Sequence, residues 1–142
     1  MEEKNAGMLR FFKYMIAFRK NHPLLRHERF FTGKPNEHGV KDIEWHGRQL
    51  VTPDWNDPNS RMLAFTIWGL SHDNDLHVIL NMENKGINFE IPSLQGKRWL
   101  KVIDTALPSP MDIVEPGKEK VVPRGVCHVK SHSVVVLISE RR

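Results

Sequence analysis

The chain has 142 residues, of which 39% are hydrophobic and 27% charged, and its formal net charge is +4. This length and composition are typical of one globular domain, and no apolar run approaches the ~20 residues that a membrane-spanning helix requires. The basic residues are interspersed with acids and accompany no zinc-finger spacing or RNA-binding aromatic motif, which argues against a nucleic-acid partner, and the single cysteine excludes an internal disulfide.

The segment from Gly7 to Arg26, GMLRFFKYMIAFRKNHPLLR, predicts an amphipathic helix. Its apolar side chains recur with helical spacing, and arginines and lysines fill the remaining face. Pro23 ends the helix, because the residue before a proline is forced out of the α region. Burying the apolar side chains is worth on the order of 10 kcal/mol, which is comparable with the whole stability of a domain. This face must therefore pack on the body of the chain or on a partner.

After residue 29 the pattern changes to short apolar or alternating runs bounded by turn residues, which is typical of strands. Seven runs are the clearest, at residues 42–46, 62–68, 76–81, 87–91, 99–103, 126–130 and 133–139. The segment SHDND, residues 71–75, is interpreted as a hairpin turn. Roughly seven or eight short strands at this spacing predict an all-β fold, an antiparallel β-sandwich of Greek-key type, preceded by one α-helix.

The histidines, the cysteine and the loop aspartates do not form a recognisable catalytic or metal-binding motif. His128 and His132 would lie ~13 Å apart along one strand, too far to bind one metal ion unless the chain folds back between them. Cys127 and His128 are neighbours in a strand and therefore point to opposite faces. Loop aspartates could form a glycosidase pair, but such pairs also arise by chance on a surface with 17 acidic residues. These are Asp54, Asp57, Asp104 and Asp112. We therefore predict no catalytic residue, no metal site and no cofactor.

The four tryptophans offer a different possibility, because the flat face of an aromatic ring stacks on the apolar face of a sugar. Trp68 and Trp99 lie within apolar strands and are interpreted as core. Trp55 lies in a polar loop and is the best candidate for a carbohydrate contact, with Trp45 as the second. Isolated surface aromatic residues are also common without any function, so both interpretations stay open.

The ordered motifs FFKYMIAFRKNHPLLR, IEWHG, PDWNDPNSRMLAF, VILN, RWLKVIDTALPSPMDI and SVVVLIS together resemble the C-terminal end of isoamylase-type debranching enzymes. These enzymes belong to the α-amylase class of glycoside hydrolases, and the resemblance extends from about Asn5 to Ser139. In that family a catalytic (β/α)8 barrel precedes an antiparallel β-sandwich. The resemblance thus implies two parts, residues 1–29 as the last barrel helix and residues 30–142 as the sandwich domain. The family's catalytic aspartate, glutamate and second aspartate lie on barrel strands upstream of the matching region, and none has a counterpart here.

The resemblance implies that the chain supports the barrel of an α-1,6-glucan debranching enzyme of glycogen or starch metabolism and is not catalytic by itself. Leu9, Phe12 and Ile16 on the helix are then expected to form the interface with the barrel, or with a second copy of the chain. An α-glucan is a further expected partner. The compartment would be the bacterial cytoplasm or the plant plastid. Two alternatives stay open: a stand-alone carbohydrate-binding or interaction module, and a complementing subunit that docks on a truncated barrel.

Overall fold

The computed structural model describes residues 2–25, 31–35, 39–69 and 74–141, and its first element is helix α1, Glu2–Asn21. The helix begins before the predicted segment and ends where the proline predicts. The short 3-10 helix η1, Pro23–Leu25, follows it, and the ring nitrogen Nδ1 of His22 lies 2.7 Å from the carbonyl oxygen of Phe18. Among the described residues, no helix is long and apolar enough to cross a membrane.

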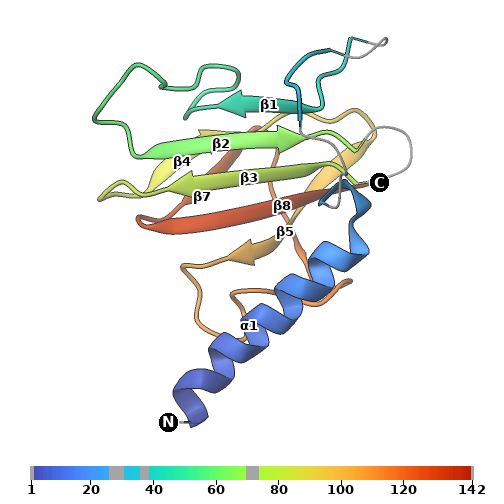
Figure 1. Ribbon diagram of the computed structural model, residues 1–142, viewed down its shortest axis with the longest axis vertical. Coiled ribbons are helices and arrows are strands. Elements are labelled where there is room, and N and C mark those ends of the chain that lie inside the picture. The colour runs from blue at the N-terminus through green and yellow to red at the C-terminus, as the bar shows by residue number, and fades with distance from the viewer. Residues whose placement is uncertain (1, 26–30, 36–38, 70–73, 142) are drawn as a thin grey trace.

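The described part of the chain then forms short strands in two antiparallel sheets (Figure 1). The strands are β1 (Ile43–His46), β2 (Met62–Ile67), β3 (Leu76–Asn81), β4 (Ile87–Glu90), β5 (Lys97–Asp104), β6 (Lys120–Val121), β7 (Val126–Val129) and β8 (Ser133–Arg141). One sheet has six strands in the order β1-β2-β3-β8-β5-β6, and β4 pairs with β7 in the other. This confirms the predicted all-β antiparallel sandwich preceded by one helix.

Every predicted strand is present, and the two-residue strand β6 is an addition that its sequence did not indicate. β6 pairs only with Leu100 and Lys101 of β5, and a run of two residues is too short to show periodicity. The predicted boundary between residues 29 and 30 lies outside the described residues, as does most of the predicted turn at 71–75.

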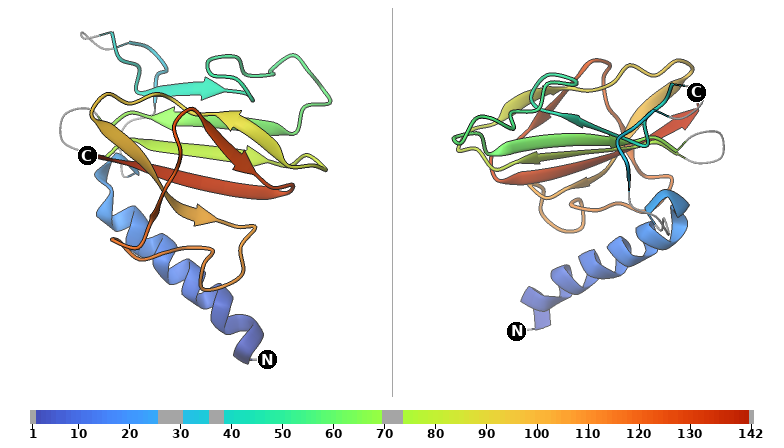
Figure 2. Two further views of the ribbon diagram at one scale, coloured as in Figure 1. Left: turned by 180° about the vertical axis from the view of Figure 1, so that it is seen from behind. Right: turned by 45° about the horizontal axis from the view of Figure 1, so that its top comes forward.

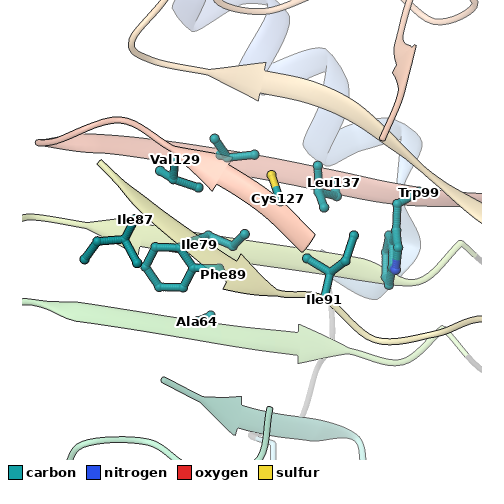
Figure 3. Packing of buried hydrophobic residues seen from close by; sticks show 10 residues of the cluster. Ala64, Ile79, Ile87, Phe89, Ile91, Trp99, Cys127, Val129 and Leu137 are labelled. Carbon is teal, nitrogen blue, oxygen red and sulfur yellow. The ribbon is translucent and has the colours of Figure 1, made fainter. Parts of the chain in front are cut away.

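The small sheet covers one face of the large sheet, and an apolar core fills the space between them (Figure 3). Phe89 from β4, Ile79 from β3 and Leu137 from β8 are fully buried in this layer. Phe89 lies between the exposed residues Asn88 and Glu90, which is the period-two pattern of a half-buried strand. The other members of the cluster are Ala64, Ile87, Ile91, Trp99, Cys127, Val129 and Val135.

Helix α1 lies over part of the opposite face of the large sheet (Figure 2). Successive residues of β8 pack on opposite faces of the large sheet. Val136 belongs to the cluster under the helix, and Val135 and Leu137 belong to the cluster under the small sheet. The helix contributes Phe11, Tyr14 and Phe18. Because the middle of β8 is covered on both sides, residues 134–138 form a continuous apolar run without alternation.

Three buried polar side chains, His46, Thr66 and His77, are joined by hydrogen bonds inside the core. The backbone N–H of Val51 donates to Nδ1 of His46 over 2.8 Å, so the neutral imidazole carries its proton on Nε2. This Nε2 lies 2.8 Å from the Thr66 hydroxyl, which lies 2.8 Å from Nδ1 of His77. Thr66 accepts from His46, and its own hydrogen points to Nδ1 of His77, the one other partner of this hydroxyl among the described residues. The proton of His77 is thus on Nε2, which has no hydrogen-bond partner among the described residues.

Cys127 on β7 is buried in the core between the sheets. Burial raises the pKa of its thiol to about 11, against a smaller lowering by Lys101. We expect a thiol reagent at pH 8 to modify Cys127 at least ~100-fold more slowly in the folded chain than in urea, because both access and thiolate are lost on folding. Spectrophotometric labelling under the two conditions measures this ratio. Equal rates would show that the thiol is accessible.

Candidate interaction surfaces

Three apolar side chains of α1 project away from the rest of the molecule. Leu9, Phe12 and Ile16 expose 57%, 58% and 55% of their surface. Their spacing of three and four residues places them in one row along the helix, and we call this row the helix ridge. Met8 and Met15 are also exposed and border it. A contiguous exposed apolar row of this kind marks an interaction site or an aggregation site.

The other side of α1 is anchored to the connection between β5 and β6. The guanidinium of Arg10 donates to the carbonyl oxygen of Ile113 over 2.9 Å and lies 3.4 Å from the carboxylate of Asp112. The hydroxyl of Tyr14 donates to Glu115 over 2.6 Å. This hydrogen bond raises the pKa of Tyr14 and lowers the pKa of Glu115. These polar contacts fix the rotation of the helix about its own axis.

The predicted apolar face of the helix is present, but the sandwich covers only part of it. Phe11 and Phe18 pack towards the large sheet, whereas Phe12 and Ile16 point outwards. Consecutive positions of an α-helix differ by about 100° in direction, and here Phe11 packs on the large sheet while Phe12 stays exposed. The sandwich covers one part of the apolar face and leaves the ridge uncovered.

A mostly apolar groove continues the ridge between α1 and the large sheet. Its volume is about 400 Å³. Met15, Ile16 and Phe18 line it from the helix. The sheet side is lined by Leu76, Val78, Ile103 and Val136. Because Ile16 belongs to both features, the ridge and the groove form one continuous apolar surface.

A second candidate surface lies at the β1 edge of the large sheet, with the loop that joins β1 to β2 (Figure 1). Trp55 in that loop exposes 62% of its surface, and Trp45 on β1 exposes 38%. The two indole rings meet edge to face at a centroid distance of 5.6 Å. Trp45 also packs on Phe65 of β2 at 5.3 Å. The structure thus brings together the two predicted carbohydrate-contact residues.

Sequence reasoning missed Phe65, the third ring of this aromatic cluster. Phe65 is the cross-strand partner of Trp45 in the antiparallel pairing of β1 with β2. Opposed residues on one face of such a pair have neighbouring Cβ atoms. The alternation of the two strands places Trp45 and Phe65 each on one face of its strand. That the two rings meet follows only from the register of β1 with β2.

A hollow of about 400 Å³ opens beside Trp55. The polar part of its lining comes from the residues on both sides of the tryptophan, with Asp54 before it and Asp57, Ser60 and Arg61 after it. The apolar part is formed by Met62, Leu63, Leu80 and Met82. The hollow therefore combines an exposed aromatic ring, charged groups of both signs and an apolar floor.

The other two tryptophans do not belong to this surface. Trp99 is 4% exposed, and its indole N–H donates to the carbonyl oxygen of Pro92 over 2.8 Å. Trp68 is half-buried, and its indole N–H donates to the carboxylate of Glu44 over 3.3 Å. The predicted core position is therefore confirmed for Trp99 and holds only in part for Trp68.

The remaining polar residues considered for chemistry make structural contacts. Asp104 accepts from Lys101 over 2.9 Å. His128 is exposed on β7, where its Nδ1 lies 2.7 Å from Oδ1 of Asn88, and the neighbouring Cys127 points into the core. Within the described ranges, no group of three or more potential ligands is placed to hold a metal ion.

Most of the chain is similar to one known domain family. Residues 44–137 match the family described as Isoamylase 1-3, C-terminal. The chain is 33% identical to the chloroplastic isoamylase 3 of Oryza sativa subsp. japonica over 118 residues, which are 82% of this chain and 14% of the rice protein. It is 31% identical to the chloroplastic isoamylase SU1 of Zea mays over 116 residues, again 82% of this chain and 14% of the maize protein. An isoamylase of Flavobacterium sp is 28% identical over 140 residues, 90% of this chain and 18% of that protein.

Proposed function

Because this chain belongs to the family of isoamylase C-terminal domains, we propose that it supports the catalytic barrel of an α-1,6-glucan debranching enzyme without catalysing the reaction itself. The chain spans only 14% of the length of its rice and maize relatives. The described residues form a sandwich and a helix, with no (β/α)8 barrel among them. The reaction would belong to glycogen or starch metabolism. Its compartment would be the plastid for a plant enzyme and the cytoplasm for a bacterial one.

The helix ridge is the observation that carries this proposal. Leu9, Phe12 and Ile16 stay exposed although the sandwich beside them has an apolar core. Fully burying side chains of this kind contributes about 1.5–3 kcal/mol each, so a second body that covers the ridge would be bound favourably. The anchors at Arg10 and Tyr14 hold the ridge outwards. A rigid, outward-facing apolar row fits the packing of a barrel helix on its barrel.

Replacing Phe12 by aspartate tests the proposed docking. The partner in this experiment is an isoamylase catalytic barrel that is produced without its own C-terminal domain. We expect the wild-type chain to associate with this barrel and the Phe12→Asp chain to lose at least ~100-fold in affinity, because a carboxylate would be desolvated without a partner. Analytical ultracentrifugation measures the association, and the debranching activity of the mixture provides a second readout.

The matched control is Val126→Asp, which adds the same charge at an exposed position on the small sheet. This variant should dock like the wild type. If Phe12→Asp and Val126→Asp docked equally well, the ridge would not be the interface. If the wild-type chain paired with itself and ignored the barrel, the ridge would serve self-association.

The size of the native polypeptide separates two forms of the proposal. An antibody raised against this chain can be used to immunoblot an extract of the source organism. A band several times larger than the 16.5 kDa of this chain favours a domain of one long enzyme. A band at 16.5 kDa favours a complementing subunit or a stand-alone interaction module.

A further inference from the structure

Trp55 is exposed and yet held in place. Trp45 contacts its ring edge to face, and Trp45 is itself packed on Phe65. A ring supported in this way loses little conformational freedom when a ligand binds. With 62% of its surface exposed, Trp55 offers a flat apolar face to a ligand.

The turn around Trp55 presents two carboxylates in fixed positions, Asp54 just before the tryptophan and Asp57 two residues after it. The backbone N–H of Asp57 donates to the carbonyl oxygen of Asp54 over 3.0 Å, and that of Ser60 donates to the carbonyl oxygen of Asp57 over 3.2 Å. The Ser60 hydroxyl donates to Oδ2 of Asp54 over 3.2 Å, and the backbone N–H of Asn59 donates to Oδ1 of Asp57 over 2.9 Å. The second oxygen of each carboxylate accepts no hydrogen bond from any residue that the structure describes.

The hollow beside Trp55 thus combines unused hydrogen-bond acceptors and unused donors. Arg61 donates its backbone N–H to Glu83 over 2.7 Å, but its guanidinium pairs with none of the described side chains. A fitting ligand needs an apolar face for the indole and groups at its rim that both donate and accept. A pyranose ring has this combination. A phosphate ester would be repelled by the two carboxylates, and a purely apolar segment would leave these polar groups unpaired.

We propose that the hollow formed by Trp55, Asp54, Asp57 and Arg61 binds a short segment of α-linked glucan. The glucose ring stacks on the indole, and its hydroxyls donate to the two carboxylates and accept from the guanidinium. The geometry selects a pyranose, and the choice of an α-glucan rests on the proposed function. Binding at this position would hold the domain on the polymer independently of the helix ridge.

Binding of maltoheptaose and retention on a glycogen-containing gel test this site in the whole chain. Trp55→Ala should weaken both by about tenfold or more, because the stacking surface is lost. Trp55→Phe should fall between the two, since a smaller ring remains. Val126→Ala removes an exposed apolar side chain on the small sheet and should bind like the wild type. Urea unfolding of each variant checks that the fold is retained.

Two results would overturn the glucan site. One is a wild-type chain that neither binds maltoheptaose nor is retained by glycogen. The other is Trp55→Ala binding as tightly as the wild type. Docking on the barrel is read out separately through Phe12→Asp, so a failure of the glucan site leaves the proposed function standing. Barrel docking that depended on Trp55, with no glucan binding, would reassign the hollow to a protein contact.

Discussion

The Phe89→Ala variant is expected to lose about 3–5 kcal/mol of its free energy of unfolding. Phe89 is fully buried and lies between the two sheets, with Ile79 of β3 in the same cluster (Figure 3). Among the described residues the small sheet consists of β4 and β7, so few neighbouring strands can shift to close the cavity. A two-stranded pair is at best marginally stable by itself. The ladder hydrogen bonds of β4 and β7 join these two strands to each other. The attachment of the pair to the large sheet therefore depends strongly on buried apolar side chains such as Phe89.

Urea unfolding followed by tryptophan fluorescence measures the loss. The matched control is Val126→Ala on β7, an exposed position of the same small sheet. It should change the free energy of unfolding by less than about 0.5 kcal/mol. A cost below about 1 kcal/mol for Phe89→Ala would contradict the description of this layer as tightly packed.

Acidification is expected to destabilise the fold from about pH 6.5 downwards. Burial lowers the pKa of His77 to about 3, with a further lowering by His46, whereas its ordinary value is 6.5. Between these two values the unfolded chain binds the extra proton and the folded chain does not. The free energy of unfolding should therefore fall by up to about 1.4 kcal/mol for each pH unit lost in this window. Above pH 6.5 the imidazole is neutral in both states, and this contribution is complete.

The His77→Asn variant isolates the contribution of this imidazole. The side-chain oxygen of asparagine can still accept from the Thr66 hydroxyl, but it does not titrate. Urea unfolding at pH 7, 6 and 5 should give a shallower slope for His77→Asn than for the wild type. The slope of His77→Asn is compared with that of His128→Asn, which removes an exposed histidine instead. Parallel lines for the wild type and His77→Asn would contradict a neutral, buried His77. His46, whose pKa burial also lowers, contributes to the slope that remains.

Much of the fold could be predicted from local patterns. β4 alternates cleanly, and β8 contains an uninterrupted apolar run at residues 134–138, so each is recognisable without its neighbours. The end of α1 before Pro23 follows from backbone sterics alone. The pairing of β8 between β3 and β5 could not be predicted, because the sequence of a strand does not show which distant strands it pairs with.

The candidate surfaces could be predicted as residues but not as sites. Trp55 was recognised from its polar loop, and its exposure agrees with that interpretation. Its support by Trp45 and Phe65 depends on the register of β1 with β2. The free carboxylate oxygens of Asp54 and Asp57 depend on which turn hydrogen bonds form. The sequence suggests such turns but does not determine which oxygen they use.

The sequence by itself determined the class of this protein: one apolar helix, a succession of short strands, and an ordered set of motifs that resembles the C-terminal region of isoamylases, the domain family that the chain matches. Only the tertiary structure decided which apolar side chains of the helix pack on the sandwich and which stay exposed. Periodicity shows that Phe11, Phe12, Ile16 and Phe18 are apolar, but it does not show which neighbour each one meets. The partners that anchor Arg10 and Tyr14, Ile113 and Glu115, lie about a hundred positions away in the chain. They set the rotation of α1, and that rotation partly buries Phe11 and Phe18 against the large sheet while it leaves the ridge exposed.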